Sequence, residues 1–308
     1  LAREYIFSDQ GQINLAKAGA IPTRTDVVIP EGVTKIGNGA FKNCYMLKSV
    51  VIGNGVEVVG ESAFENCVEL NRIIVPKSVK RFERNAFASC YDVVSVYYEG
   101  SVDEWAEIDF NERSNPICTN LYVGAYLVDK ITVKTAKKIS KYAFACCKSL
   151  TEVELANSVE IIEDNAFNAC KRLTSVKIPE SVIRIGNGAF HCCQNLKSVE
   201  IPASVTSIGG APFSACSALT SINVNENNPK YKSVNGNVFT KDGKTLVLYA
   251  PGKTEEEFVV PNGVTYIGEG ALSTSAFKKI VLPNGVEKIG EWAFGLNENL
   301  TNITIPDS

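Results

Sequence analysis

The stretch IGNGAFKNCYMLKSVVI at residues 36–52 returns in closely similar form as IGNGAFHCCQNLKSVEI at residues 185–201. Related stretches lie between the two, including VGESAFENCVELNRIIV at 59–75 and IEDNAFNACKRLTSVKI at 162–178. Self-similarity at a fixed spacing is the signature of a repeat protein, in which one short supersecondary unit is stacked many times. The chain is therefore expected to form a solenoid whose units contact mainly their neighbours.

The phenylalanine of the A-F pair sets the period. It recurs every 23 residues in two series, and a third series with a spacing of 22 has leucine in its first position. The nine positions are Phe41, Phe64 and Phe87, then Phe144, Phe167, Phe190 and Phe213, and finally Leu272 and Phe294. This length falls within the range of about 20–29 residues that leucine-rich repeats occupy. We therefore expect nine units.

Each unit reads as two short extended segments joined by turns. The L-x-x-V-x-I pattern, as at 47–52, places two apolar residues on the same face of a short strand. A proline-containing turn, as at 30–32, leads to a second extended stretch with the pattern V-x-x-I, as at 33–36. The A-F-x-x-C segment then forms a compact turn or 3₁₀ piece. No unit can bury its own apolar face, so we expect stacked strands about 4.8 Å apart.

Two insertions interrupt the period, at about residues 97–130 and 223–257. The first contains SVDEWAEI at 101–108, whose S-x-x-E spacing and shared apolar face predict a short amphipathic helix laid on the solenoid. The second contains Asp242-Gly243 between two apolar runs, which predicts a β-hairpin. Both insertions rejoin the repeat, so we find no clean domain boundary.

The ends of the chain differ from its middle. We expect the solenoid to span residues 27–308 and residues 1–26 to form an N-terminal cap or a divergent repeat. ITIPDS at 303–308 matches VKIPES at 176–181, so a tenth unit is expected to begin there. Because solenoids need capping at their ends, we expect the chain to be a fragment of a longer protein.

Composition argues against two classes of partner. With 31 Lys+Arg against 34 Asp+Glu, the net charge is −3 and no basic stripe is present, which disfavours nucleic-acid binding. No apolar run approaches the roughly 18 residues of a membrane span, so we expect no membrane insertion of this segment.

Cysteine recurs three residues after the phenylalanine in seven units, at Cys44, Cys67, Cys90, Cys147, Cys170, Cys193 and Cys216. No C-x-x-C spacing occurs, which argues against zinc-ribbon and thioredoxin sites. Stacked units hold their Cβ atoms about 4.8 Å apart, beyond the usual 3.5–4.5 Å of a disulfide, so these are expected to be buried free thiols. A disulfide ladder is the alternative. Cys118, Cys146 and Cys192 lie off this row, and we expect the last two to be exposed.

Three other features carry no catalytic or ligand chemistry. His191, the only histidine, occupies a mid-turn slot whose residue varies between units, as at a solvent-exposed position. The run Glu255–Glu257 lacks the alternating spacing of a calcium loop. The position of Gly39 in IGNGAF is held by Tyr142 and Trp292 in other units, which a phosphate-binding loop does not tolerate. We therefore expect no enzyme activity, no cofactor and no metal site.

The full pattern I-P-x-S-V-x-x-I-G-x-x-A-F-x-x-C-x-x-L-x-S-V, clearest at 178–199 and 201–222, resembles the BspA-like class of leucine-rich repeats. The resemblance covers about residues 27–308, and the segments 97–108 and 225–253 also resemble stretches found between units in bacterial members. It implies a right-handed solenoid of the α/β repeat class, mainly short β-strands with turns. It further implies a secreted or surface-anchored protein that binds other macromolecules, with no catalytic residues.

The outward-facing slot of each first strand varies between units, and varied residues on a regular scaffold are typical of macromolecular recognition. The candidate binding residues on this exposed strand face are Val51, Ile74, Tyr97, Glu154, Lys177 and Glu200. The first three adjoin one another as an apolar-to-aromatic patch, which is either a binding site or a surface covered by the first insertion.

The residue patterns favour a non-enzymatic binding or adhesion module, and the resemblance implies that it belongs to an extracellular or cell-surface protein. Its partner would be a host or microbial surface protein or glycan, and we expect the module to be a monomer. The alternative is a structural scaffold or spacer that displays another domain encoded beyond this segment.

Overall fold

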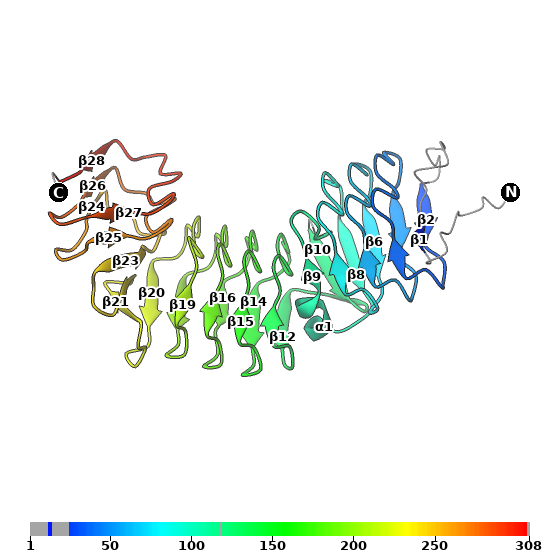
Figure 1. Ribbon diagram of the computed structural model, residues 1–308, viewed down its shortest axis with the longest axis horizontal. Helices are drawn as coiled ribbons and strands as arrows, with labels where there is room; N and C mark the ends of the chain where they lie inside the picture. Colours follow the sequence, from blue (N-terminus) through cyan, green and yellow to red (C-terminus); the bar gives the residue numbers. More distant parts are fainter. Residues whose placement is uncertain (1–11, 14–24, 118, 307–308) are drawn as a thin grey trace. The chain divides into compact units, whose positions relative to one another are not determined.

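The computed structural model describes residues 12–13, 25–117 and 119–306, and its regular secondary structure consists mainly of short strands stacked side by side and joined by turns (Figure 1). Contacts divide the chain into two compact units: unit 1 comprises Leu1–Asp129 and Ile139–Ser149, and unit 2 comprises Lys130–Lys138 and Leu150–Ser308. The sequence showed no such boundary. In the structure, the first sheet of unit 1 ends at an antiparallel strand, which occupies the edge where a further parallel strand would pair.

Unit 1 contains two sheets, one for each extended segment of the repeat. The strands of the first sheet, called here the strand face, are parallel and paired with a register of 23 residues, apart from the insertion and the antiparallel β11. They are β2 (Asp26–Val28), β4 (Ser49–Val51), β6 (Arg72–Val75), β8 (Ser95–Tyr98), β10 (Asn120–Val123) and β11 (Tyr126–Leu127). The second sheet contains β1 (Gln12–Ile13), β3 (Lys35–Ile36), β5 (Val58–Val59), β7 (Arg81–Phe82) and β9 (Asp109–Phe110).

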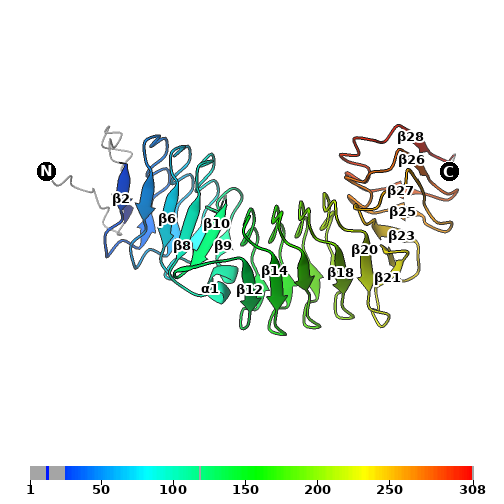
Figure 2. The same ribbon diagram turned by 180° about the vertical axis from the view of Figure 1, so that it is seen from behind.

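The first insertion contains the predicted helix, α1 (Val102–Glu107), and both halves of the Ser101/Glu104 capping box are formed. The helix is not laid on the outside of the solenoid, because Trp105 is fully buried and donates from Nε1 to the carbonyl of Ala143 at 2.7 Å. The Trp105 ring packs 5.1 Å from that of Tyr98, and α1 lies next to β9 (Asp109–Phe110) in both views (Figures 1 and 2). Of the two strands that follow the helix, β9 joins the second sheet and β10 joins the strand face. The segment therefore forms a further coil of the stack.

Unit 2 also has two extended segments in each coil, but its described strands are divided among five sheets instead of two. The strand-face strands are β12 (Lys130–Val133), β14 (Glu152–Leu155), β16 (Ser175–Lys177), β18 (Ser198–Ile201), β20 (Ser221–Val224), β24 (Glu257–Val259), β26 (Lys279–Val281) and β28 (Asn302–Thr304). The other strands are β13 (Lys138–Ile139), β15 (Ile161–Ile162), β17 (Arg184–Ile185), β19 (Ser207–Ile208), β21 (Tyr231–Val234), β22 (Asn237–Thr240), β23 (Thr245–Leu248), β25 (Tyr266–Ile267) and β27 (Lys288–Ile289).

The hairpin predicted around Asp242-Gly243 is confirmed, since β22 and β23 pair antiparallel on either side of it. A further strand, β21, was missed, although its Asn235-Gly236 turn is an equally clear hairpin signal with positive φ at both residues. The strand β23 then pairs in parallel with β25, so the second insertion also returns to the stack as an additional coil.

Phenylalanine rings form a continuous buried row inside each unit. The ring centroids of Phe41 and Phe64 are 5.0 Å apart and those of Phe167 and Phe190 are 5.2 Å apart, with nearly parallel planes in both pairs. This spacing follows from the distance of about 4.8 Å between neighbouring strands. Stacked aromatic pairs of this kind add about 0.5–1.5 kcal/mol each beyond the area that they bury.

The bend that contains the phenylalanine is held by an alternating hydrogen-bond pattern. The N–H groups of Gly39, Phe41 and Asn43 donate to carbonyls of the next coil at 2.7–2.8 Å, whereas the residue after each donates to the carbonyl three residues back. Two positions in each bend have φ between +48° and +63°. The first is held by Gly39, Ser62, Asn85, Tyr142, Asn165, Gly188, Ala211, Gly270 and Trp292, and the second by Asn43, Asn66, Ser89, Cys146, Ala169, Cys192, Ala215, Thr274 and Leu296.

The substitution Ala169→Gly is expected to stabilise the protein. Left-handed backbone costs a residue with a Cβ about 1–2 kcal/mol, and glycine loses about 0.5–1 kcal/mol more on folding than alanine, so the net gain should reach about 1 kcal/mol. The matched control is Ala166→Gly, at a fully buried position without positive φ, which should destabilise by about 1–2 kcal/mol. Urea unfolding midpoints measure both effects. Equal destabilisation by the two substitutions would contradict the strain argument.

Candidate functional site

The outer side of the strand face in unit 1 carries an unbroken row of apolar and aromatic side chains. Successive members are direct register partners on neighbouring strands. They are Val28, Val51, Ile74, Tyr97 and Tyr122, called here the apolar row. Val28 at its end is 60% exposed, and the other four are half-buried because they pack side by side. The structure thus brings together the predicted residues Val51, Ile74 and Tyr97.

The aromatic end of the apolar row is built around stacked tyrosines. The rings of Tyr97 and Tyr122 lie 4.6 Å apart with an angle of 16° between their planes. The guanidinium of Arg72 lies 5.0 Å from the centre of the Tyr97 ring, within cation–π range. Sequence reasoning missed Tyr122 because the insertion shifts it out of the 23-residue register. The pattern N-L-Y-V at residues 120–123 was the sequence signal that could have identified this strand.

The first insertion extends the patch. Trp105 contacts Tyr98, whose side chain points into the core, away from the neighbouring outward-facing Tyr97. The strand β10 adds Tyr122 to the row, and β11 pairs beyond it, where Tyr126 is strongly exposed.

A polar row runs beside the apolar row, because residues two apart on a strand share a face. Its members are Asp26, Ser49, Arg72, Ser95 and Asn120, in register along the same five strands. The Asp26 carboxylate accepts hydrogen bonds from the hydroxyls of Ser49 at 2.5 Å and Thr25 at 2.8 Å. These bonds hold the pKa of Asp26 below its usual value. The face therefore offers apolar contact and hydrogen bonding in adjacent lines.

The three charged candidates lie in unit 2. Glu154 and Lys177 are register partners on β14 and β16, and Glu200 lies on the next strand-face strand, β18. All three line a cavity of about 610 Å³ that opens on the strand face. The structure thus places them around one hollow, which the sequence pattern did not indicate.

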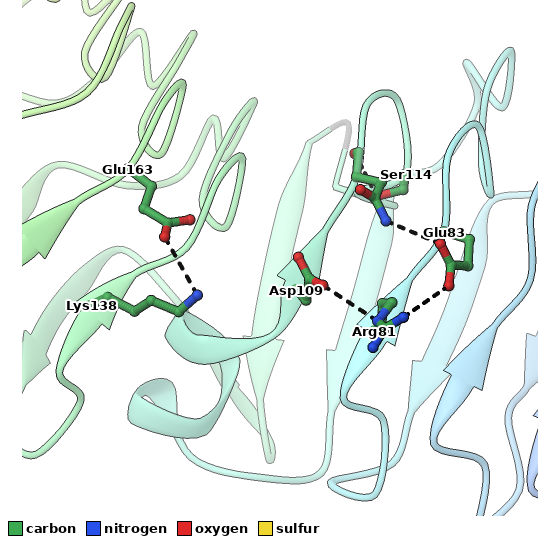
Figure 3. A network of polar contacts seen from close by, with 7 residues as sticks. Arg81, Glu83, Asp109, Ser114, Lys138 and Glu163 are labelled. Atoms are coloured by element: carbon green, nitrogen blue, oxygen red, sulfur yellow. Dashed lines mark hydrogen bonds and ion pairs between the residues drawn. The ribbon is translucent and has the colours of Figure 1, made fainter. Parts of the chain in front are cut away.

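Charged side chains on the second sheets are paired along the stack. Arg81 lies between Glu83 at 3.3 Å and Asp109 at 3.4 Å, and Lys138 pairs with Glu163 at 3.5 Å (Figure 3). Surface pairs of this kind contribute about 0–1 kcal/mol each. These ion pairs link residues within the stack of coils, and we assign them no binding role.

The cysteine row consists of buried free thiols, as predicted. No disulfide is formed by any of the nine described cysteines, and the seven members of the row are buried. The Sγ atoms of Cys67 and Cys193 each donate to the carbonyl of a phenylalanine in the preceding coil, at 3.2 Å. Burial raises the pKa of the Cys44 thiol. Cys146 and Cys192 were expected to be exposed and are half-buried.

Two remaining expectations concern Cys118 and His191. Cys118 lies outside the described residues. His191 was expected to be solvent-exposed and is half-buried, and burial lowers its pKa, so it is neutral at pH 7. No cluster of metal-binding side chains is found among residues 25–117 and 119–306. Within the same residues, no helix is long and apolar enough to cross a bilayer.

Comparison with known proteins places this geometry among bacterial repeat proteins. A family model described as a BspA type leucine rich repeat region matches residues 22–121, 137–255 and 251–308. A leucine rich cell surface protein of Faecalibacterium prausnitzii has 26% identity and a TM-score of 0.52, with 97% of this chain and 74% of that chain covered. A comparison with curated proteins returned no match.

Two further solved structures show lower similarity. The pneumococcal vaccine antigen PcpA has 21% identity and a TM-score of 0.43, with 92% of this chain and 51% of that chain covered. A leucine-rich repeat protein of Eubacterium ventriosum has 20% identity and a TM-score of 0.46, with 91% of this chain and 63% of that chain covered.

The buried thiols should resist labelling until the protein unfolds. With Ellman's reagent at pH 8 and no reductant, we expect the seven thiols of the row to stay unreactive in the native protein. Burial keeps the reagent away from their sulfur atoms. All seven should react in denaturant. The appearance of fewer than seven new thiols on unfolding would contradict the free-thiol assignment.

Proposed function

Because this chain belongs to the BspA-type leucine-rich-repeat family, we propose that it is a non-enzymatic binding module of an extracellular or cell-surface protein. The proposal rests on one observation above all: the apolar row forms a continuous, outward-facing line on unit 1. Leucine-rich-repeat folds typically serve binding, and the Faecalibacterium prausnitzii relative is described as a cell surface protein.

Rigidity is the physical basis of the proposed binding. Each strand of the face is hydrogen-bonded to its neighbours, and the bends behind it are tied by a second ladder. A preorganised surface loses little conformational entropy on association, so more of the contact energy appears as affinity. The stacked pair of Tyr97 and Tyr122, with Arg72 beside it, supplies the residue types most often found as binding hot spots.

The proposed partner is a host or microbial surface protein or glycan, bound by a monomer of this chain. An apolar and aromatic line favours a partner segment that buries apolar surface against it, while the polar row beside it provides hydrogen bonds. Aromatic faces also suit the apolar faces of sugar rings, so both classes belong in the first binding screen.

The substitution Tyr97→Ala is expected to weaken binding strongly. Loss of a hot-spot tyrosine costs about 2 kcal/mol or more, which corresponds to roughly 30-fold in affinity. The matched control is Tyr91→Ala, at a tyrosine that is 78% exposed but lies outside the apolar row. The measurement is binding of the labelled protein to arrays of extracellular-matrix proteins and glycans, followed by titration of any ligand found.

The outcomes of this screen separate the two functions considered from the sequence. Equal affinity of the Tyr97→Ala and Tyr91→Ala variants would remove the apolar row as the binding face. Uniform absence of binding by a correctly folded protein would instead favour the scaffold or spacer function. Urea unfolding of both variants checks that neither effect comes from lost stability.

A further inference from the structure

The strand face of unit 2 is interrupted between β16 and β18. The strands β14 and β16 pair with each other, as do β18 and β20, whereas β16 and β18 lie next to one another without pairing. The same two coils remain joined elsewhere. Arg184 pairs with Ser207 in the second sheet, and the N–H of Phe190 donates to the carbonyl of Pro212 at 2.8 Å in the bend. The coils are therefore open on the strand face alone.

Proline removes one ladder hydrogen bond at this opening. At the end of β20, Asn225 donates its N–H to the carbonyl of Ile201 on the preceding strand at 2.9 Å. Pro202 holds the same position at the end of β18 and has no N–H to donate toward β16. The backbone groups on the facing edges of β16 and β18 are thus left without ladder partners within the described chain.

The opening exposes part of the apolar core as the floor of the cavity. Val176 on β16 is half-buried, whereas its counterparts Val153 and Val199 are at most 2% exposed. Pro179 and Pro202 contribute apolar walls. The volume of about 610 Å³ lies within the range of about 300–1,000 Å³ that ligand sites occupy.

The rim of the cavity has an unbalanced charge. Its four charged side chains are Glu154, Lys177, Glu180 and Glu200. None of these glutamates, nor Lys177, forms a side-chain hydrogen bond or an ion pair with the described residues. Elsewhere on the strand face of unit 2, by contrast, Lys130 pairs with Glu152 at 3.0 Å. Three unpaired carboxylates against one lysine leave a site that attracts a cation.

We propose that this cavity binds the lysine or arginine side chain of an extended peptide segment. The aliphatic stem of such a side chain matches the apolar floor at Val176, and its cationic head matches the carboxylates of Glu154 and Glu200. The unpaired strand edges provide backbone donors and acceptors for the peptide main chain. The site lies in unit 2 and is independent of the apolar row in unit 1.

Fluorescence anisotropy tests this proposal with a fluorescein-labelled pentapeptide, Thr-Val-Arg-Val-Thr. The comparison peptide has citrulline in place of arginine, which removes the charge and keeps the shape. We expect the arginine peptide to bind roughly tenfold more tightly, the difference that one charge-assisted hydrogen bond makes. The substitution Glu200→Gln should remove most of that preference, and Lys177→Glu should increase it.

The control variant is Glu160→Gln, which makes the same change of charge at an exposed residue outside the cavity. It should bind both peptides as the unmodified protein does, and Tyr97→Ala should do so as well. Equal binding of the two peptides, absence of binding, or equal losses in Glu200→Gln and Glu160→Gln would each overturn the proposal. Because Tyr97→Ala affects only the proposed function of unit 1, failure of one proposal is distinguishable from failure of the other.

Discussion

The hydrogen-bond ladder of the bend is the constraint on which the rest of the structure depends. Alternate N–H groups, such as those of Phe41 and Asn43, point along the stack to the next coil, and those between them close turns within the coil. A uniform helical turn cannot satisfy both sets, so two residues in each bend adopt left-handed backbone. Even Tyr142 and Trp292 accept this conformation, which shows that the ladder outweighs about 1–2 kcal/mol of local strain at each such site.

Because the bend has a constant length, the residues that lie next to one another in space can be identified from the sequence. Residues 23 apart lie over one another, and for this reason the row of phenylalanines, the row of cysteines and the adjacency of Val51, Ile74 and Tyr97 were all predictable. The helix in the first insertion was predictable from its capping box and the hairpin in the second from Asp242-Gly243. Each of these signals is local or strictly periodic.

Features that depend on a change of register or on missing bonds were not predictable. Tyr122 joins the apolar row only because the chain around α1 folds back to place β10 beside β8. The depth of Trp105 in the core and the half-buried position of His191 depend on which neighbouring coil packs against them. The gap between β16 and β18 could not be predicted from Pro202, because Pro76 also follows a strand, β6, that pairs normally. Proline is therefore not a sufficient signal.

Separation of core and outward slots explains how one fold can carry two dissimilar surfaces. Val50, Val153 and Val199 face inward, are buried and hold the coils together. The next residue on each strand contributes little to that packing, so it can be apolar in unit 1 and charged in unit 2 without changing the stack. Because stability resides in the ladders and the inner rows, substitutions in the outer slots should alter recognition at small cost in folding free energy. In both proposals, the chemistry of the outward slots, rather than the repeat itself, would therefore determine which partner each unit binds.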